Sequence, residues 1–304
     1  MKITQKKGAL TYVTSVITAA LMVGAVFGGQ YAIAGIADTK HNLGSNGPGN
    51  KFTTAGAGSG EICVFCHTPH GAATADKIPL WNRSASPGAS YTTYNSLGTL
   101  SLDGGTAAVG STSMACLSCH DGAQAMNTVI NAPGSGLAGD ADWKTDGTGW
   151  SGPRQTAGKM TGVAAVNTDA DSLKNDHPIG IQYAGGPKVL ANIPRALVDG
   201  SMPDYPKSNF KDPDFFPAKS AILGGSQVWW VETNADGVRQ KTDLPLYARS
   251  GAVTYTDGTT STVAANAPEP FVECASCHDP HSDKATFLRT ENTNSKVCLS
   301  CHDK

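Results

Sequence analysis

The chain has 304 residues, a formal net charge of −2 at neutral pH, and 35 glycines with 17 prolines. Leu, Ile, Val and Phe together make up 54 residues, which is below the roughly 20% level under which a chain has difficulty forming an apolar core. The acidic balance argues against nucleic acid and anionic lipid as partners. We therefore predict a loop-rich chain whose core is filled by something besides its own side chains.

The first segment, residues 1–34, has the three parts of a secretory signal peptide. Three lysines form a basic start, an apolar stretch follows, and Ala32 and Ala34 precede the expected cleavage point. Losing the three lysines changes the formal net charge from −2 to −5. An uncleaved anchor is the alternative, but threonines, a serine and glycines interrupt the apolar stretch. We expect export, with no membrane span after cleavage.

Every cysteine belongs to one of four Cys-x-x-Cys-His motifs. The motifs are Cys63-Val-Phe-Cys66-His67, Cys116-Leu-Ser-Cys119-His120, Cys274-Ala-Ser-Cys277-His278 and Cys298-Leu-Ser-Cys301-His302. This spacing attaches a c-type haem, because two thiols add across the vinyl groups of one porphyrin and the histidine becomes the proximal iron ligand. Zinc sites, redox dithiols and local disulfides also use paired cysteines, but they do not need a histidine after every pair. We predict four covalently attached haems.

Four of the eight histidines remain after each motif has taken one. They are His41, His70, His177 and His281. Four six-coordinate irons need four distal ligands, so the count predicts histidine on both faces of every haem. The alternatives are one or two methionine ligands, or one open iron. The candidate methionines are Met114, Met126, Met160 and Met202.

Two of the spare histidines, His70 and His281, follow a proximal ligand by three residues, with a proline between. Such a side chain starts on the proximal side of its own porphyrin, so we expect each to ligate a different haem and to tie two haems together. His177 precedes Pro178, which disfavours helix, and we expect an extended loop to deliver it. His41 follows the expected cleavage point, from where a terminal arm reaches its own haems or a neighbouring subunit.

The motif spacing divides the exported chain into three parts. Residues 35–135 form a module with haems 1 and 2, residues 136–265 a haem-free middle segment with one distal histidine, and residues 266–304 a module with haems 3 and 4. Two stretches, 228–238 and 252–263, have hairpin patterns, the second with an Asp-Gly pair typical of a type I′ turn. We expect a mostly irregular multihaem cytochrome c, in which loops and short helices wrap a stacked haem core and a few β-hairpins lie in the middle segment.

An iron with histidine on both faces has no open site for oxygen, nitrite or peroxide. It changes oxidation state with little rearrangement, and two axial histidines give lower potentials than histidine with methionine. We therefore predict an electron-transfer protein, not an enzyme, with all four potentials below zero. The rival is a multihaem reductase, which needs one five-coordinate iron.

Three stretches of the chain carry a resemblance to a known family. They are Glu61 to Gly71, Pro79 to Arg83, and Val272 to His281. Here the chain resembles the tetrahaem cytochromes of metal-reducing bacteria, in particular the OmcE-type extracellular cytochrome nanowires. The resemblance implies homopolymeric filaments with stacked haems, contacts with other multihaem cytochromes, and extracellular electron acceptors such as metal oxides. It also implies that one distal histidine comes from the adjacent subunit, a role that the position of His41 fits best.

The resemblance covers the motifs and the spare histidines but little of the middle segment. It implies an extracellular or cell-surface filament. A soluble periplasmic tetrahaem shuttle with the same haem chemistry is the alternative. The long middle segment, rich in Gly, Ser and Thr, favours the filament, because a compact shuttle needs far fewer residues per haem.

Overall fold

The structure is a computed structural model, and it describes residues 35–53, 60–74, 78–84, 91–97, 101–132, 148–166, 173–174, 176, 178–195 and 202–303. The predicted signal peptide and His177 lie outside these residues. The chain from Ile36 to Lys304 forms one unit. Within the described ranges, no helix has both the length and the apolar character needed to cross a bilayer.

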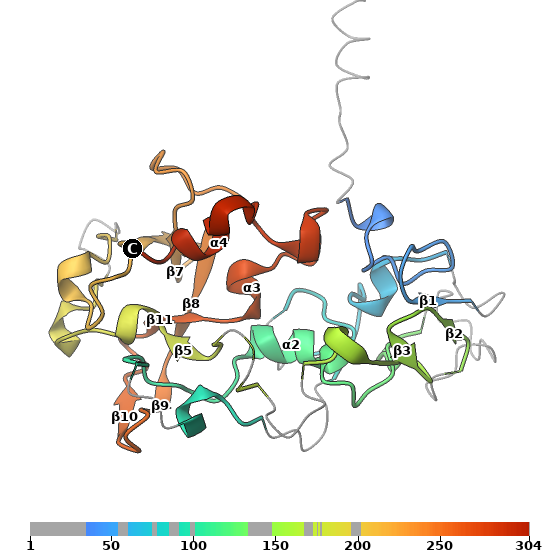
Figure 1. Cartoon of the computed structure of the whole chain (residues 1–304), viewed down its shortest axis with the longest axis horizontal. Helices are drawn as coiled ribbons and strands as arrows, with labels where there is room; N and C mark the ends of the chain where they lie inside the picture. The colour runs from blue at the N-terminus through green and yellow to red at the C-terminus, as the bar shows by residue number, and fades with distance from the viewer. Residues whose placement is uncertain are drawn as a thin grey trace, which may run out of the picture. The chain divides into compact units, whose positions relative to one another are not determined.

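Short elements alternate with loops (Figure 1). The α-helices are α2 (Ser111–His120), α3 (Cys274–Cys277) and α4 (Lys296–Leu299). The 3-10 turns are η1 (Gly35–Asp38), η2 (Cys63–Phe65), η3 (Tyr94–Leu97), η4 (Gly162–Ala164), η5 (Tyr183–Gly185), η6 (Leu190–Asn192), η7 (Lys207–Asn209), η8 (Ala285–Phe287) and η9 (Thr293–Ser295). The strands are β1 (Lys51–Phe52), β2 (Trp150–Ser151), β3 (Gln155–Thr156), β4 (Lys159–Met160), β5 (Ile181–Gln182), β6 (Lys219–Leu223), β7 (Ser226–Val231), β8 (Leu244–Arg249), β9 (Gly251–Thr254), β10 (Thr260–Val263) and β11 (Glu269–Val272).

A five-stranded antiparallel sheet in the order β5-β11-β8-β7-β6 is the largest regular element of the described chain. Strand β11 pairs on both sides, with β5 and β8. One residue after β11 ends, the third motif begins as α3, which contacts β8 and α2 (Figure 1). The sheet therefore holds the chain at the point where it enters the third haem motif.

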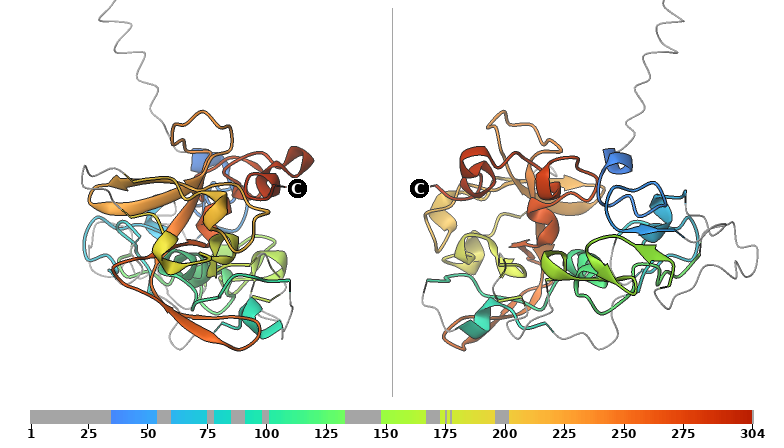
Figure 2. Two further views of the ribbon diagram at one scale, coloured as in Figure 1. Left: turned by 90° about the vertical axis from the view of Figure 1, so that its left-hand side faces the viewer. Right: turned by 45° about the vertical axis from the view of Figure 1, so that its right-hand side comes forward.

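The second predicted hairpin forms, but with a different turn. Strands β9 and β10 pair in register, and the hairpin lies at the bottom of both views in Figure 2. The Gly258 N–H donates to the Tyr255 carbonyl over 3.0 Å, the Tyr255 N–H donates to the Thr259 carbonyl over 2.9 Å, and Gly258 has φ 82°. This is a three-residue loop with glycine in the left-handed position, so the predicted type I′ turn is wrong.

The first predicted hairpin is correct in its strand and wrong in its turn. Val228 to Val231 lie in β7, but no strand follows directly after Gly237. Instead the Asp243 carboxylate accepts N–H bonds from Thr233 at 3.1 Å and Gln240 at 2.7 Å and closes a loop into β8. The tight turn of β7 is on its other side, at Gly224-Gly225, where both φ angles are positive as a type I′ turn requires.

The middle segment contributes an apolar cluster of its own. The side chains of Tyr205, Phe210 and Trp229 are fully buried, and they pack with Tyr183 and Leu244. Counting only Leu, Ile, Val and Phe underestimates such a core, since Trp and Tyr each bury about 150–250 Å². A smaller cluster, made by Leu43, Phe52, Phe65 and Met126, lies beside the first motif.

Candidate haem-binding site

Each Cys-x-x-Cys-His motif winds into a helical turn. The first motif is η2, the second is the end of α2, the third is α3, and the fourth overlaps α4. In three motifs the histidine N–H donates to the carbonyl of the first cysteine: His67 to Cys63 at 2.7 Å, His278 to Cys274 at 3.1 Å, and His302 to Cys298 at 3.0 Å. Helical winding puts positions i, i+3 and i+4 on one face, so both thiols and the imidazole of a motif share a side. None of the eight cysteines forms a disulfide.

Four imidazoles share one hydrogen-bond arrangement. In each, Nδ1 lies within hydrogen-bond distance of a backbone carbonyl oxygen. The pairs are His67 with Pro79 at 2.9 Å, His120 with Ala164 at 2.6 Å, His278 with Thr286 at 2.8 Å, and His41 with Pro280 at 3.0 Å. A carbonyl oxygen only accepts, so Nδ1 carries the proton and donates in all four. The lone pair is then on Nε2, which is the arrangement of a metal-ligating histidine.

His41 is the one spare histidine in this group, and its ring also stacks on that of Phe287 with centroids 3.9 Å apart. Burial lowers the pKa of His41 to about 4, and the nearby His120, His281 and His278 also lower it, against the opposing bond to the Pro280 carbonyl. Burial likewise lowers the pKa of His120. Both imidazoles are therefore neutral at neutral pH, as iron ligation requires.

Two of the supporting carbonyls depend on unusual backbone. Leu80, directly after the Pro79 carbonyl, has φ 57°, and Thr286, whose own carbonyl accepts from His278, has φ 51°. A non-glycine residue in this region costs on the order of 1–3 kcal/mol, and such strain gathers at functional sites. The strained residues occur here where the chain turns a carbonyl toward a motif histidine.

Two spare histidines each lie opposite a motif histidine. The ring centres of His67 and His281 are 6.2 Å apart, and those of His120 and His41 are 6.1 Å apart. A metal–imidazole bond is about 2.0–2.1 Å, and the ring centre lies about 1.1 Å beyond the nitrogen, so two imidazoles on opposite sides of one metal have centres roughly 6.3 Å apart. Both separations are close to that value, with the rings of His67 and His281 inclined by 13° and those of His120 and His41 by 73°.

The pairing of His67 with His281 fits the expectation that His281 serves a haem other than its own motif's. His281 has its Nδ1 at 3.4 Å from an Asp279 carboxylate oxygen. The sequence left His41 free to reach a haem of its own chain or of a neighbouring subunit, and the structure places its ring 6.1 Å from that of His120 in the same chain. His70 is exposed.

The cysteines of successive motifs are neighbours. Cys66 acts electrostatically on Cys119, the thiols of Cys116 and Cys274 interact directly, and Cys277 acts on Cys298. The four attachment points therefore follow one another in space in the order of the sequence.

Apolar side chains stand exposed beside three of the motifs. Leu80 is 54% exposed, Val163 83% and Leu299 47%. Leu80 and Val163 each neighbour a residue whose carbonyl accepts from a motif histidine, and Leu299 lies inside the fourth motif. A porphyrin is a large apolar disc, and these side chains offer it apolar contacts.

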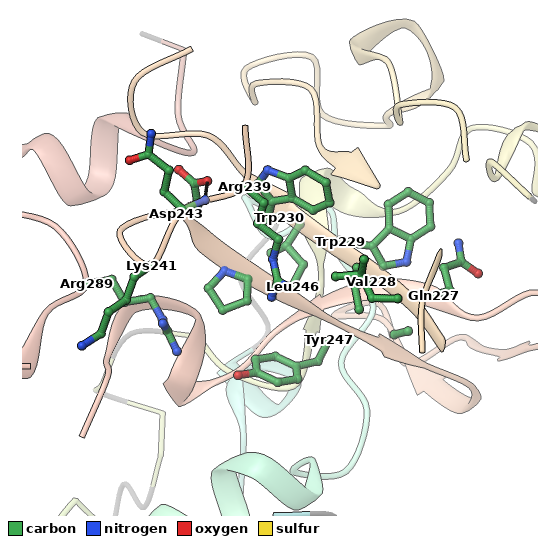
Figure 3. Close-up of a pocket in the computed structure, with 14 residues that line it drawn as sticks. Gln227, Val228, Trp229, Trp230, Arg239, Lys241, Asp243, Leu246, Tyr247 and Arg289 are labelled. Atoms are coloured by element: carbon green, nitrogen blue, oxygen red, sulfur yellow. Dashed lines mark hydrogen bonds between the residues drawn. The ribbon is translucent and has the colours of Figure 1, made fainter. Parts of the chain in front are cut away.

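A cleft of about 660 Å³ opens beside the third motif (Figure 3). Trp230 and Tyr247 line it together with three cations, Arg239, Lys241 and Arg289. Arg289 belongs to the surroundings of the motif, because its backbone N–H donates to the Cys277 carbonyl at 2.9 Å. The volume is that of a small-molecule site. Figure 3 shows Lys241 and Arg289 on one side of the cleft and Arg239 beside Trp230, with the guanidinium carbon 5.8 Å from a ring centre of that residue.

Three of the four methionines proposed as alternative ligands have other partners. Met126 is 1% exposed and packs in the cluster beside the first motif. The Met160 sulfur accepts a hydrogen bond from Asn50 Nδ2 at 3.3 Å. Met202 packs against the core of the middle segment.

Sequence reasoning did not find the groups that support the ligands. The accepting carbonyls belong to Pro79, Ala164, Pro280 and Thr286. They carry no signal in the sequence, since any residue has a carbonyl. Two buried charged side chains, Arg83 and Glu273, were also missed, although both lie in stretches that carry the resemblance.

A family described as the doubled CXXCH motif matches residues 269–304, which contain the third and fourth motifs. This match implies covalently attached c-type haem and indicates a multihaem c-type cytochrome, a class whose general activity is electron transfer. A comparison with curated proteins gave no match.

Proposed function

We propose that this chain is an exported tetrahaem cytochrome c that carries electrons over long distances outside the cell, with a histidine on each face of every iron. The observation that supports this best is the pair of imidazole separations, 6.2 Å for His67 with His281 and 6.1 Å for His120 with His41. Each pair joins a motif histidine to a spare one. A haem closed on both faces exchanges electrons and has no position for a substrate.

The chain's own residues perform three tasks in this function. The cysteine thiols hold the porphyrins by covalent bonds. The carbonyls that accept from Nδ1 fix the tautomer and the orientation of each imidazole, and they raise its basicity as a ligand. The Cys116–Cys274 and Cys277–Cys298 neighbourhoods keep consecutive attachment points close, which supports a continuous row of haems. The haem itself supplies the one-electron chemistry.

We further propose that the chain polymerises and that one distal histidine crosses to the neighbouring subunit. With His41 and His281 facing motif histidines of their own chain, His70 is the described histidine left for this role. Its carbonyl accepts from Thr68 Oγ1 at 3.0 Å and from Asn131 Nδ2 at 2.7 Å, so the backbone is fixed while the imidazole is exposed. A fixed, exposed ligand is suited to an iron of another copy.

Electron microscopy of the secreted, haem-loaded protein tests the polymer. His70→Ala is expected to abolish filaments and leave monomers with one high-spin haem. His281→Ala is the matched control, because it also removes one ligand but an intrachain one, so one haem becomes high-spin while filaments persist. Filaments with fully low-spin haems in His70→Ala contradict the role of His70. Monomers of the unaltered protein favour the periplasmic shuttle instead.

A further inference from the structure

Arg83 is a buried cation whose described partners are all neutral. Its side chain is 0% exposed. It donates from Nε to Ser118 Oγ at 3.1 Å, from Nη1 to the Met126 carbonyl at 2.7 Å, and from Nη2 to the carbonyls of Ser118 at 2.7 Å and Ala125 at 3.0 Å. Among the described residues no carboxylate forms an ion pair with it. The guanidinium is well satisfied in hydrogen bonds, but its charge is not compensated by any of these groups.

The guanidinium lies between the first and second motifs. Ser118, which accepts two of its bonds, is inside the second motif. The preceding residue, Asn82, donates its N–H to the Cys66 carbonyl at 2.8 Å and its Nδ2 to the Val64 carbonyl at 2.7 Å, both inside the first motif. These bonds fix the guanidinium to the backbone of the second motif and fix the neighbouring Asn82 to the backbone of the first.

The third motif also has cations nearby, and Arg289 donates from Nε to the Ala275 carbonyl inside the motif at 2.8 Å, but these cations lie near carboxylates. Arg249 pairs with the Glu273 carboxylate at 2.6 Å. Arg289 has its Nη1 at 4.0 Å from the Asp279 carboxylate. Arg83 therefore differs from Arg249 and Arg289 in having only neutral hydrogen-bond partners among the described residues.

A buried charge acts strongly because the interior screens it weakly. Reducing a ferric haem removes one positive charge from the ring and iron. A fixed cation beside the haem therefore favours the reduced state over the oxidised one and raises the reduction potential. Burying a charge without an anion also carries a desolvation penalty that lowers the stability of the fold. Hydrogen bonding alone could be provided by a neutral side chain without that penalty.

We propose that the buried charge of Arg83 raises the reduction potentials of the first and second haems relative to the third and fourth. This inference rests on the four haems of the proposed function. It gives the haem row a direction, because electrons entering at the fourth haem come to rest preferentially at the first two.

Potentiometric titration of the haem-loaded protein, followed by visible absorption, tests this with three variants. Arg83→Gln removes the charge and Arg83→Lys keeps it while losing the planar fork of donors. Lys219→Gln is the charge-matched control, because Lys219 pairs with Asp204 on the sheet at 2.8 Å. Mass analysis and EPR first establish four low-spin haems in each variant, so failure of the proposed function is recognised separately.

In Arg83→Gln we expect two of the four midpoint potentials to fall. At a fixed applied potential, the ratio of oxidised to reduced haem should change at least tenfold at each, which corresponds to 59 mV for one electron. Arg83→Lys is expected to stay within threefold of the unaltered protein even if it unfolds more easily, and Lys219→Gln to change no midpoint. Equal shifts in the glutamine and lysine variants, or none in either, overturn the proposal. If Arg83→Gln yields no haem-loaded protein, Ser118→Asp, which sets an anion beside Arg83, is expected to lower the same two midpoints, and unchanged midpoints there overturn it.

Discussion

Replacing Glu273 by glutamine tests how the second and third motifs are held together. Glu273 is the residue before α3, and its carboxylate accepts from Arg249 Nη1 at 2.6 Å and from Ser113 Oγ of α2 at 2.6 Å. Ser113 Oγ in turn accepts the Cys274 N–H at 2.9 Å. The side chain of Glu273 is 1% exposed and that of Arg249 is 19% exposed. One buried carboxylate therefore links the helices that carry two haem motifs.

The magnitude follows from burial. Removing one partner of a buried ion pair costs about 3–5 kcal/mol, because the other charge is left alone. Arg249 keeps some contact with water, and burial raises the pKa of Glu273 against the opposing effects of Arg249 and Ser113, so we expect the lower end, about 3 kcal/mol. For a protein of this size that corresponds to a fall in Tm of about 6–12 °C.

Urea denaturation of the haem-loaded protein, followed by circular dichroism, measures the change. Asp204→Asn is the matched control, since it breaks a more exposed ion pair with Lys219 and is expected to cost about 0.2–1 kcal/mol. In the double variant with Arg249→Met the two effects are expected to be strongly non-additive, because no lone charge remains. A loss for Glu273→Gln no larger than that of Asp204→Asn would refute the reasoning.

Three further predictions concern Gly110, Glu269 and His41. Gly110→Ala is expected to destabilise by about 1–3 kcal/mol, seen as a lower urea midpoint, because its Cβ would lie 2.2 Å from Glu273 Oε1; an unchanged midpoint would contradict the close approach. Burial raises the pKa of Glu269, so the folded protein binds a proton at this carboxylate more readily than the unfolded chain does. Its contribution to the free energy of unfolding is therefore greatest below the unfolded pKa. That contribution is lost as pH rises through the folded pKa, by at most about 1.4 kcal/mol per pH unit. Glu269→Gln should remove this pH dependence of stability, measured by urea denaturation between pH 4 and 7. Identical pH profiles for the variant and the unaltered protein would contradict the role of Glu269. His41→Ala is expected to convert one haem to high spin without loss of filaments, as EPR and microscopy would report, and loss of filaments would restore the intersubunit role of His41.

The local parts of the site were predictable from the sequence, and the pairings were not. Each motif holds its cysteines and histidine within five residues, so one helical turn fixes their relation. The partners of His67 and His120 come from residues more than 70 positions away in the chain, and only the tertiary fold brings them together. The supporting carbonyls depend on backbone angles such as φ 57° at Leu80. A leucine in the sequence does not predict a positive φ.

The sheet was predictable in part for similar reasons. The Asp257-Gly258 pair located the β9–β10 hairpin, because glycine is needed wherever φ is positive. The loop before β8 was misjudged, because the Asp243 carboxylate closes it by accepting the N–H groups of Thr233 and Gln240. Strand β8 itself contains Pro245, which removes a ladder donor and hides the strand pattern.

The central claim is that every iron lies between two imidazoles. EPR of the fully oxidised protein, on material in which mass analysis has counted four attached haems, tests it most directly. The account predicts low-spin ferric signals that integrate to four irons. A high-spin signal from one of the four irons in the assembled protein would contradict it and would point to a haem that binds a substrate.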